Sequence, residues 1–269
     1  MSEEPVEGPL ARLPEDYFRK PSSARVWDYW LGGKDNYAVD RAAGDAFIEK
    51  YPDILMIARQ SRALLVRVVR HLAGEVGVRQ FLDIGTGLPT LNNTHEVAQA
   101  VAPESKIVYV DNDPIVLAHA RALLTNTTSE GFTTYVHADV REPEHILAQA
   151  RTMLDFEQPV AVLLLGILGH AADTFEQMRA ITSSLVAAVP SGSYLVVADG
   201  AEVGVEEFRE ATAMRGYRLT TLDQFRACFE GLDLVEPGLV PRNHWRPEKT
   251  EVGGNLPPVA SYVAVGRKP

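Results

Sequence analysis

Short apolar runs alternate with segments of helical periodicity between residues 79 and 199. Five runs are rich in Val, Leu and Ile and predict buried strands at residues 79–85, 106–113, 133–139, 159–166 and 193–199. The segments between them predict helices at residues 94–101, 114–124, 143–153 and 173–189. Buried strands that alternate with helices are typical of parallel sheets covered on both faces, so the pattern predicts a doubly wound α/β fold.

The last part of the chain breaks this alternation. After a late helix within residues 222–230, two apolar runs at 231–240 and 259–268 follow each other without a helix between them. Parallel neighbours normally need a crossover helix, so we expect these two strands to form an antiparallel pair at one edge of the sheet. The complete prediction is a Rossmann-like sheet of seven strands.

Ahead of the first strand, the chain shows helical patterns only. Ser22 or Ser23 can cap a first helix, and Gly32 can end it with left-handed backbone. We expect three helices here, at residues 22–31, 38–50 and about 53–74.

These patterns divide the chain into two parts. Residues 1–77 are predicted to form an N-terminal tail and a helical cap or lid, because residues 1–20 are rich in Pro and Glu and the rest is helical. Residues 78–269 are predicted to form the α/β core.

Composition narrows the classes of function. The chain has 269 residues and a net charge of −10, which argues against broad attraction to nucleic acid or anionic lipid. No run of 18 apolar residues and no apolar leader is present, so we expect a cytoplasmic protein without a membrane span. The single cysteine, Cys228, excludes an intrachain disulfide, and the scattered histidines predict no metal site.

The first predicted strand runs into FLDIGTGLPT at residues 81–90. Gly85 and Gly87 would let the backbone turn tightly and approach a ligand. A nicotinamide fingerprint would need glycine where this chain has Thr90. Asp83 would repel a pyrophosphate, but it can hold a ligand ammonium directly or through water. The alternative is an ordinary strand-to-helix turn.

Acidic residues also follow the next two strands. Asp111, 24 residues beyond Gly87, stands where an acid takes both ribose hydroxyls in doubly wound nucleotide sites, and Asn112 beside it is expected to contact the same ligand. Asp139 could accept from an adenine amino group, with the Val140 N–H donating to the ring.

The three carboxylates of Asp83, Asp111 and Asp139 are expected along one edge of the sheet. Such a row suits an ammonium, a ribose and an adenine amine better than it suits phosphates. S-adenosylmethionine carries all three groups without phosphate, and its sulfonium also favours an acidic pocket. The expected cofactor is therefore S-adenosylmethionine, with S-adenosylhomocysteine as its product.

The same motifs resemble those of class I S-adenosylmethionine-dependent methyltransferases over residues 78–268. The matching elements are FLDIGTG, VYVDND, HADV, PSGSYLVVAD and the terminal strand pair. Pro89 departs from the pattern, since many members have a third glycine there.

A narrower resemblance extends from about residue 21 to the end. The segments SSARVWDYWLGGKDNYAVDR, QFLDIGTGLPT, THEVAQAVAP, VYVDNDP and GLVPRNHWRP are similar to one bacterial methyltransferase family, formerly catalogued as a domain of unknown function. The GGKDN segment is its most specific mark. This resemblance implies the fold and the cofactor but no substrate.

The segment after the fourth strand, at residues 163–173, is expected to border the methyl acceptor. Gly166 ends that strand near the cofactor, and His170 can act as a base or position the acceptor. Equally, His170 could cap a loop or pack under the lid. His244 and Trp245 could form a wall of the acceptor pocket, or Trp245 could anchor a solvated loop.

The stretch WDYWLGGKDNY at residues 27–37 predicts a lid over the cofactor. In this hypothesis Tyr29 or Tyr37 contacts the cofactor, and Lys34 or Asn36 lies near its carboxylate. Arg62, in the third helix, is a further candidate for that carboxylate. The alternative is that the two glycines only stop the helix and the aromatic residues anchor the cap.

Together these features predict an S-adenosylmethionine-dependent methyltransferase that acts on a small-molecule acceptor. The motif [DN]-P-P-[YFW] is missing after the fourth strand, which argues against amino methylation of DNA bases. Two alternatives stay open: a catalytically silent S-adenosylmethionine-binding or regulatory protein, and a nicotinamide-dependent oxidoreductase, against which Asp83 and Thr90 both count.

Overall fold

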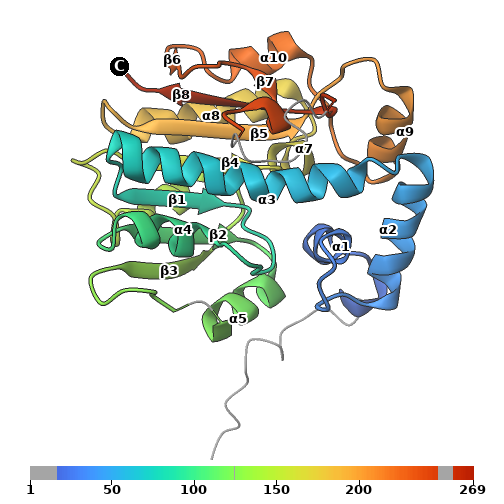
Figure 1. The fold of residues 1–269 in the computed structure, drawn as a ribbon, viewed down its shortest axis with the longest axis horizontal. Coiled ribbons are helices and arrows are strands. Elements are labelled where there is room, and N and C mark those ends of the chain that lie inside the picture. The colour runs from blue at the N-terminus through green and yellow to red at the C-terminus, as the bar shows by residue number, and fades with distance from the viewer. Residues whose placement is uncertain (1–16, 124, 248–256) are drawn as a thin grey trace, which may run out of the picture.

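An eight-stranded sheet forms the centre of the protein in a computed structural model that describes residues 17–123, 125–247 and 257–269 (Figure 1). The strand order is β3-β2-β1-β4-β5-β8-β6, and β7 also pairs with β8. Five strands run parallel, as predicted: β1 (Gln80–Ile84), β2 (Lys106–Asp111), β3 (Phe132–His137), β4 (Ala161–Leu165) and β5 (Tyr194–Gly200).

The antiparallel edge differs in detail from the prediction. β8 (Ser261–Arg267) runs antiparallel to β5, as expected. The predicted strand at residues 231–240 is instead two short strands, β6 (Asp233–Leu234) and β7 (Val240–Pro241), which both pair with β8. Pro237, which has no N–H to donate to a ladder, lies between them, so the expected sixth strand becomes two strands and the sheet has eight instead of seven.

Helices cover both faces of the sheet, because successive side chains of each strand point to opposite sides. On one face, Leu82, Val108 and Leu164 pack against α6 (Pro143–Ala150), α8 (Phe175–Ala188) and α10 (Leu222–Ala227). On the other face, Phe81 and Ile107 pack against α3 (Ile54–Arg70), the π-helical turn η3 (His71–Val76) and α4 (Thr94–Val101). α5 (Pro114–Leu123) contacts β2 and β3.

The N-terminal helices α1 (Ser23–Trp30) and α2 (Ala38–Lys50) form a separate unit, the cap. In Figure 1 the cap stands at the end of the sheet toward which the arrow of β1 points. Its hydrophobic cluster includes Trp30 and Phe47, the first turn of α3, and Phe208 of α9 (Glu206–Met214). The predicted boundary at residue 77 thus falls after a helix, α3, that contacts both the cap and the sheet.

Two helices have no counterpart in the prediction, α7 (Leu168–Ala171) and α9. α7 is a single turn, and α9 buries only Phe208, Ala211 and Thr212, so neither carries a long apolar stripe. Throughout the described ranges, every helix is too short or too polar to cross a lipid bilayer.

Candidate functional site

A cavity of about 380 Å³ opens along the carboxyl edge of the parallel strands, beneath α1 of the cap. Ligands bind at this edge in doubly wound sheets, and the volume falls within the range of small-molecule pockets. Eight of the predicted site residues line the cavity: Arg62, Asp83, Gly85, Gly87, Asp111, Asn112, Gly166 and His170. The lining residues that the structure describes do not include Tyr29, Lys34, Asn36, Asp139 or Val140.

The turn after β1 brings the backbone close to β4. Gly85 and Gly87 have φ values of +76° and +65°, which side chains other than glycine rarely adopt. A Cβ on Gly85 would also lie 2.6 Å from the side chain of Ile167, which follows β4. The sequence therefore needs glycine at position 85 both for the turn and for the close packing of two strand ends.

Asp111, at the end of β2, is held in place by backbone donors. The Gly87 N–H donates to Oδ2 and the Asp113 N–H to Oδ1, each at 2.9 Å. Burial raises the pKa of the Asp111 carboxyl above its usual value, and these hydrogen bonds partly offset the rise. The carboxylate thus lines the cavity in one fixed orientation, and each oxygen has lone pairs left for ligand hydroxyls.

Asp83, on the adjacent strand β1, is a buried carboxyl beside a positive charge. The Thr94 hydroxyl, at the start of α4, donates to its Oδ2 at 2.6 Å. Burial raises the pKa of Asp83 to about 6, against the lowering effects of Thr94 and the Arg62 guanidinium. Asp83 is therefore mostly ionised at neutral pH and can hold a cationic group in the cavity.

Arg62, on α3, places a guanidinium between the turn after β1 and the cavity. Its Nη2 donates to the carbonyls of Leu91 and Asn92, at 2.9 and 2.7 Å. Its Nε is buried and has no hydrogen-bond partner among the described residues. An unpaired buried donor is costly, so this nitrogen fits an acceptor supplied by a ligand, such as a carboxylate.

Asp139 lies next to the cavity-lining Asn112, whose Nδ2 donates to it at 2.9 Å. The Arg141 guanidinium and backbone N–H also donate to Asp139, which holds the pKa of its carboxyl well below the usual range. Val140 is buried in the core beneath α6. The assignment of Asp139 and Val140 to an adenine ring stays a prediction.

His170, in α7, reaches the cavity from the end of β4. Its ring lies edge-on to Tyr217, with 4.7 Å between the ring centroids. His170 is exposed toward the cavity. Desolvation by the neighbouring protein, together with the charge of Arg215, lowers the pKa of His170 to about 4. The imidazole is therefore neutral at physiological pH.

The helix α1 lines the cavity with residues other than the ones predicted. Trp27, Trp30 and Leu31 face the cavity together with Asp28, on which the GGKDN turn closes. By contrast, the Tyr29 hydroxyl donates to Asp45 of α2 at 2.7 Å, on the outer side of the cap. The 3.6-residue repeat of a helix explains why Tyr29 does not share a face with Trp27 and Trp30.

The turn after α1 is built on the buried carboxylate of Asp28. Asn36 Nδ2 and the Asp35 N–H donate to its Oδ2, at 2.8 and 3.0 Å. Gly32 has a left-handed φ of +79°, as predicted, and a Cβ on Gly33 would lie 1.9 Å from Asp28 Oδ1. The Gly-Gly pair thus allows the turn to wrap around Asp28.

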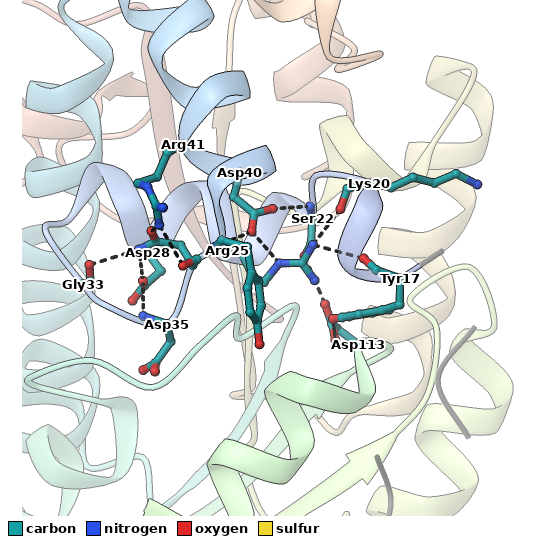
Figure 2. A network of polar contacts seen from close by, with 12 residues as sticks. Tyr17, Lys20, Ser22, Arg25, Asp28, Gly33, Asp35, Asp40, Arg41 and Asp113 are labelled. Atoms are coloured by element: carbon teal, nitrogen blue, oxygen red, sulfur yellow. Dashed lines mark hydrogen bonds and ion pairs between the residues drawn. The ribbon is translucent and has the colours of Figure 1, made fainter. Parts of the chain in front are cut away.

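Figure 2 shows how the cap is fastened to the core near the cavity. The hydroxyls of Tyr17 and Ser22 both donate to Asp113, which follows β2 and also accepts from the Ile115 N–H at the start of α5. Asp113 therefore caps α5 and in addition holds the start of α1.

Within the cap, a buried ion pair fixes α1 against α2. Arg25 Nε lies 2.7 Å from Asp40 Oδ2, and both side chains are almost fully buried (Figure 2). Asp40 also accepts from the backbone N–H groups of Ser22 and Tyr37. One signal for these contacts is present in the sequence: Arg25 and Asp28 are charged residues at buried positions of the helix SARVWDYW.

The half of the cavity near β4, β5 and β8 has mostly apolar and aromatic walls, and two arginines also line it. Apolar and aromatic side chains from the cap, α3, α9 and the turn after α9 form its walls: Trp30, Phe47, Ile54, Ile57, Phe208 and Tyr217. The arginines are Arg215 and Arg242, which no motif in the sequence indicates. His244 and Trp245, the expected wall of the acceptor pocket, are not among the lining residues that the structure describes. Trp245 is instead fully buried in the core against α3, and Arg242 reaches the cavity from the same segment.

The model of a family described as S-adenosyl methyltransferase matches residues 16–269. The chain belongs to the S-adenosyl methyltransferase family. The resemblance seen in the sequence is thereby confirmed, and the cofactor of the family is S-adenosylmethionine.

Solved structures agree with this family. A DUF574 family protein from Streptomyces avermitilis MA-4680 is 42% identical, with a TM-score of 0.87 over 94% of this chain and 99% of that one. A candidate methyltransferase from Thermobifida fusca YX is 39% identical, with a TM-score of 0.87 over 95% and 97%. The N-methyltransferase NodS from Bradyrhizobium japonicum WM9, solved with S-adenosylhomocysteine, shares only the fold, at 13% identity and a TM-score of 0.52 over 92% and 100%. A search of curated proteins finds no match.

The cavity of this S-adenosyl methyltransferase family member suits its cofactor chemically. Its half near β1 and β2 combines two buried carboxyls, Asp83 and Asp111, with the unpaired donor of Arg62. These groups complement an ammonium, a ribose and a carboxylate. In the described parts of the chain, no three His, Cys, Asp or Glu side chains are grouped as metal ligands.

Proposed function

We propose that the protein is an enzyme that methylates a small molecule, with the cofactor in the β1 and β2 half of the cavity and the acceptor in the β4 and β5 half. One observation carries this proposal: a single cavity joins an acidic half, suited to the cofactor, to an apolar half beneath the cap. A protein that only bound the cofactor would not need the second half, which favours the enzyme over a silent binding protein.

In this proposal the residues of the acidic half each hold one part of the cofactor. Asp111 accepts from the two ribose hydroxyls, Asp83 holds the ammonium directly or through water, and Arg62 donates to the carboxylate. Asn112 lines the cavity beside the position of the adenine ring. Asp139 and the Val140 N–H, which do not line the cavity, are assigned to the far edge of that ring. When bound, S-adenosylmethionine supplies a methyl group on a positively charged sulfur.

The glycine turn contributes backbone rather than side chains. Gly85 and Gly87 keep the space after β1 free of Cβ atoms, and Gly166, with φ of +101°, does the same after β4. The main chain can therefore approach the cofactor at the junction of the two halves. Much of the catalytic effect expected of such a site comes from holding the two reactants in line and excluding water.

His170 is proposed to position the acceptor. A neutral imidazole can accept a hydrogen bond from the attacking group of the acceptor. Because the pKa of His170 is about 4, the imidazole is a weak base. His170 is therefore better suited to orienting the attacking group than to removing a proton from it.

Within the predicted lid, residues 1–77, the part from residue 17 to the end of α2 is proposed to cover both halves; residues 1–16 lie outside the described residues. This role rests on Trp27, Trp30 and Leu31, which line the cavity, and on the fastening of α1 to Asp113 beside the ribose position. Tyr29, Lys34 and Asn36 would support the lid rather than contact the cofactor.

Isothermal titration calorimetry with S-adenosylhomocysteine and NAD tests this proposal. We expect S-adenosylhomocysteine to bind with one site per chain and NAD to give no heat of binding, because Asp83 repels a pyrophosphate. Failure of S-adenosylhomocysteine to bind would contradict the proposal.

A further inference from the structure

Arg242 lies at the far end of the apolar half of the cavity. It follows β7, whose Pro241 pairs with Tyr262, next to the Ser261 that pairs with Gly200 at the end of β5. The Arg242 side chain is 3% exposed and lines the cavity. Its place is therefore on the acceptor side of the site, away from Asp83 and Asp111 on β1 and β2.

The guanidinium of Arg242 has an unused donor. Its Nη1 donates to the Ser61 hydroxyl of α3, while its Nε is buried and has no partner among the described residues. A buried guanidinium with an unpaired N–H is costly unless a ligand completes its hydrogen bonds. Burial lowers the pKa of Arg242 only to about 10, so the group stays positively charged at neutral pH.

The charge of Arg242 is only partly balanced by the protein. Asp199, at the end of β5, is the nearest acidic influence, but none of the ion pairs formed by the described residues includes Arg242. The Asp199 carboxylate instead accepts from the N–H groups of Leu168 and Gly169, and burial raises its pKa to about 7. A ligand anion would complete the charge balance at Arg242.

A second arginine, Arg215, adds positive charge on the open side. It follows α9, is half-buried, and lies close enough to His170 to lower the pKa of that imidazole. Its nearest acidic influence, Asp40, already pairs with Arg25 at 2.7 Å. The acceptor half of the cavity is thus positive in a chain whose net charge is −10.

We propose that the methyl acceptor is a carboxylic acid with an apolar or aromatic body. Its carboxylate binds to Arg242, and its body lies in the cavity against the sides of Trp30, Phe47 and Phe208 that line it. One buried guanidinium edge matches a carboxylate, whereas a phosphate dianion would need more donors than Arg242 has left. This inference rests on the proposed function, because it names the class of molecule that the acceptor half takes.

Calorimetry on the protein saturated with S-adenosylhomocysteine tests the inference, with 3-phenylpropionate, 3-phenylpropionamide and phenyl phosphate as probes. We expect the acid to bind at least about tenfold more tightly than the amide, since a hydrogen-bonded charge pair is lost in the amide. Phenyl phosphate should bind more weakly than the acid.

Substitutions of single arginines test whether Arg242 and Arg215 cause the tighter binding of the acid than of the amide. Arg242→Gln should abolish the preference for the acid and leave the affinity for S-adenosylhomocysteine unchanged. Because Arg242 is buried and that variant could fail to fold, Arg215→Gln, on a half-buried residue, should reduce the preference about threefold. Arg218→Gln is the matched control, since this exposed arginine donates to the Asp173 carbonyl outside the cavity and should keep the full preference.

Four results would overturn the inference: equal binding of acid and amide, tighter binding of phenyl phosphate, no binding of any probe, or loss of S-adenosylhomocysteine affinity in Arg242→Gln. The last would place Arg242 on the cofactor instead. Failure of the unmodified protein to bind S-adenosylhomocysteine would instead contradict the proposed function itself, so the two failures are distinguishable.

Discussion

Asp111 is the residue on which the proposed cofactor position depends most. Both of its oxygens accept from backbone N–H groups, so its orientation toward the cavity is fixed before a ligand arrives. Such preorganisation reduces the entropy lost on binding, so more of the free energy of each hydrogen bond to the ligand contributes to affinity.

Replacing Asp111 by Ala should weaken S-adenosylhomocysteine binding by about 2–3 kcal/mol, roughly 30- to 150-fold. The variant loses two hydrogen bonds to a charged acceptor and strands the ribose hydroxyls. Calorimetry measures the change, and Asp223→Asn, on an exposed carboxylate of α10, serves as the control. Unchanged affinity in Asp111→Ala would remove the ribose assignment.

Asp83 makes cofactor binding depend on pH. Its pKa is raised to about 6 by burial, so the carboxylate that pairs with the ammonium is present above that pH and is lost as the pH falls through it. We expect the dissociation constant of S-adenosylhomocysteine to increase about tenfold from pH 7.5 to pH 5.

The variant Asp83→Asn isolates this effect. It should bind more weakly at pH 7.5 and should show a much smaller change between pH 7.5 and pH 5. If the unmodified protein showed constant affinity over that range, or if the variant kept the full pH dependence, Asp83 would not be the group that holds the ammonium.

Among single residues, the sequence predicted which strand-end residues line the cavity. It did not predict which residues of the cap line it, nor that Arg215 and Arg242 do. Asp83 and Asp111 line the cavity because the carboxyl ends of neighbouring parallel strands must meet at one edge. Arg242 reaches the same cavity only because β7 pairs with β8, a long-range contact that leaves no local pattern in the sequence.

Secondary-structure elements were likewise predicted where local sequence determines them and missed where tertiary contacts do. The bounds of α2 and α4 coincide with those predicted, because clear polar–apolar changes and a first-turn acid mark their starts. α9 was missed because its stability depends on packing against the cap rather than on its own periodicity. The orientation of α1, which decides whether Tyr29 or Trp30 faces the cavity, likewise depends on tertiary contacts.

The fastening of α1 to Asp113 predicts a measurable effect on the cap. The double variant Tyr17→Phe and Ser22→Ala removes both hydroxyls. The free energy that holds the cap on the core should fall by about 1–2 kcal/mol, since two hydrogen bonds to a carboxylate are lost. Amide hydrogen exchange should become faster in residues 23–37, and S-adenosylhomocysteine affinity should fall about tenfold.

Tyr29→Phe is the matched control for that experiment. It also removes one tyrosine hydroxyl from the cap, but the lost hydrogen bond, to Asp45, lies on the outer side. The control should leave exchange in residues 23–37 and cofactor affinity nearly unchanged. Equal effects of the two changes would argue that the cap is destabilised as a whole and that Asp113 has no special role.

For the molecule as a whole, the fold class was predictable because the apolar runs of β1, β2, β4 and β5 are nearly continuous and helices separate the strands. The join between the cap and the core was less predictable. α3 packs on the sheet with Leu64 and Val68 and on the cap with Ile54 and Ile57, so one helix belongs to both hydrophobic clusters. α3 therefore joins the cap to the core beside the cavity.

A crystal structure of the protein with S-adenosylhomocysteine would show directly where the cofactor lies in the cavity. We predict the ribose hydroxyls on Asp111, the amino-acid end between Asp83 and Arg62, and the sulfur facing the apolar half that contains His170. If the adenosine of the ligand lay in the apolar half, or if the ligand bound outside the cavity, the proposed division of the cavity into a cofactor half and an acceptor half would be wrong.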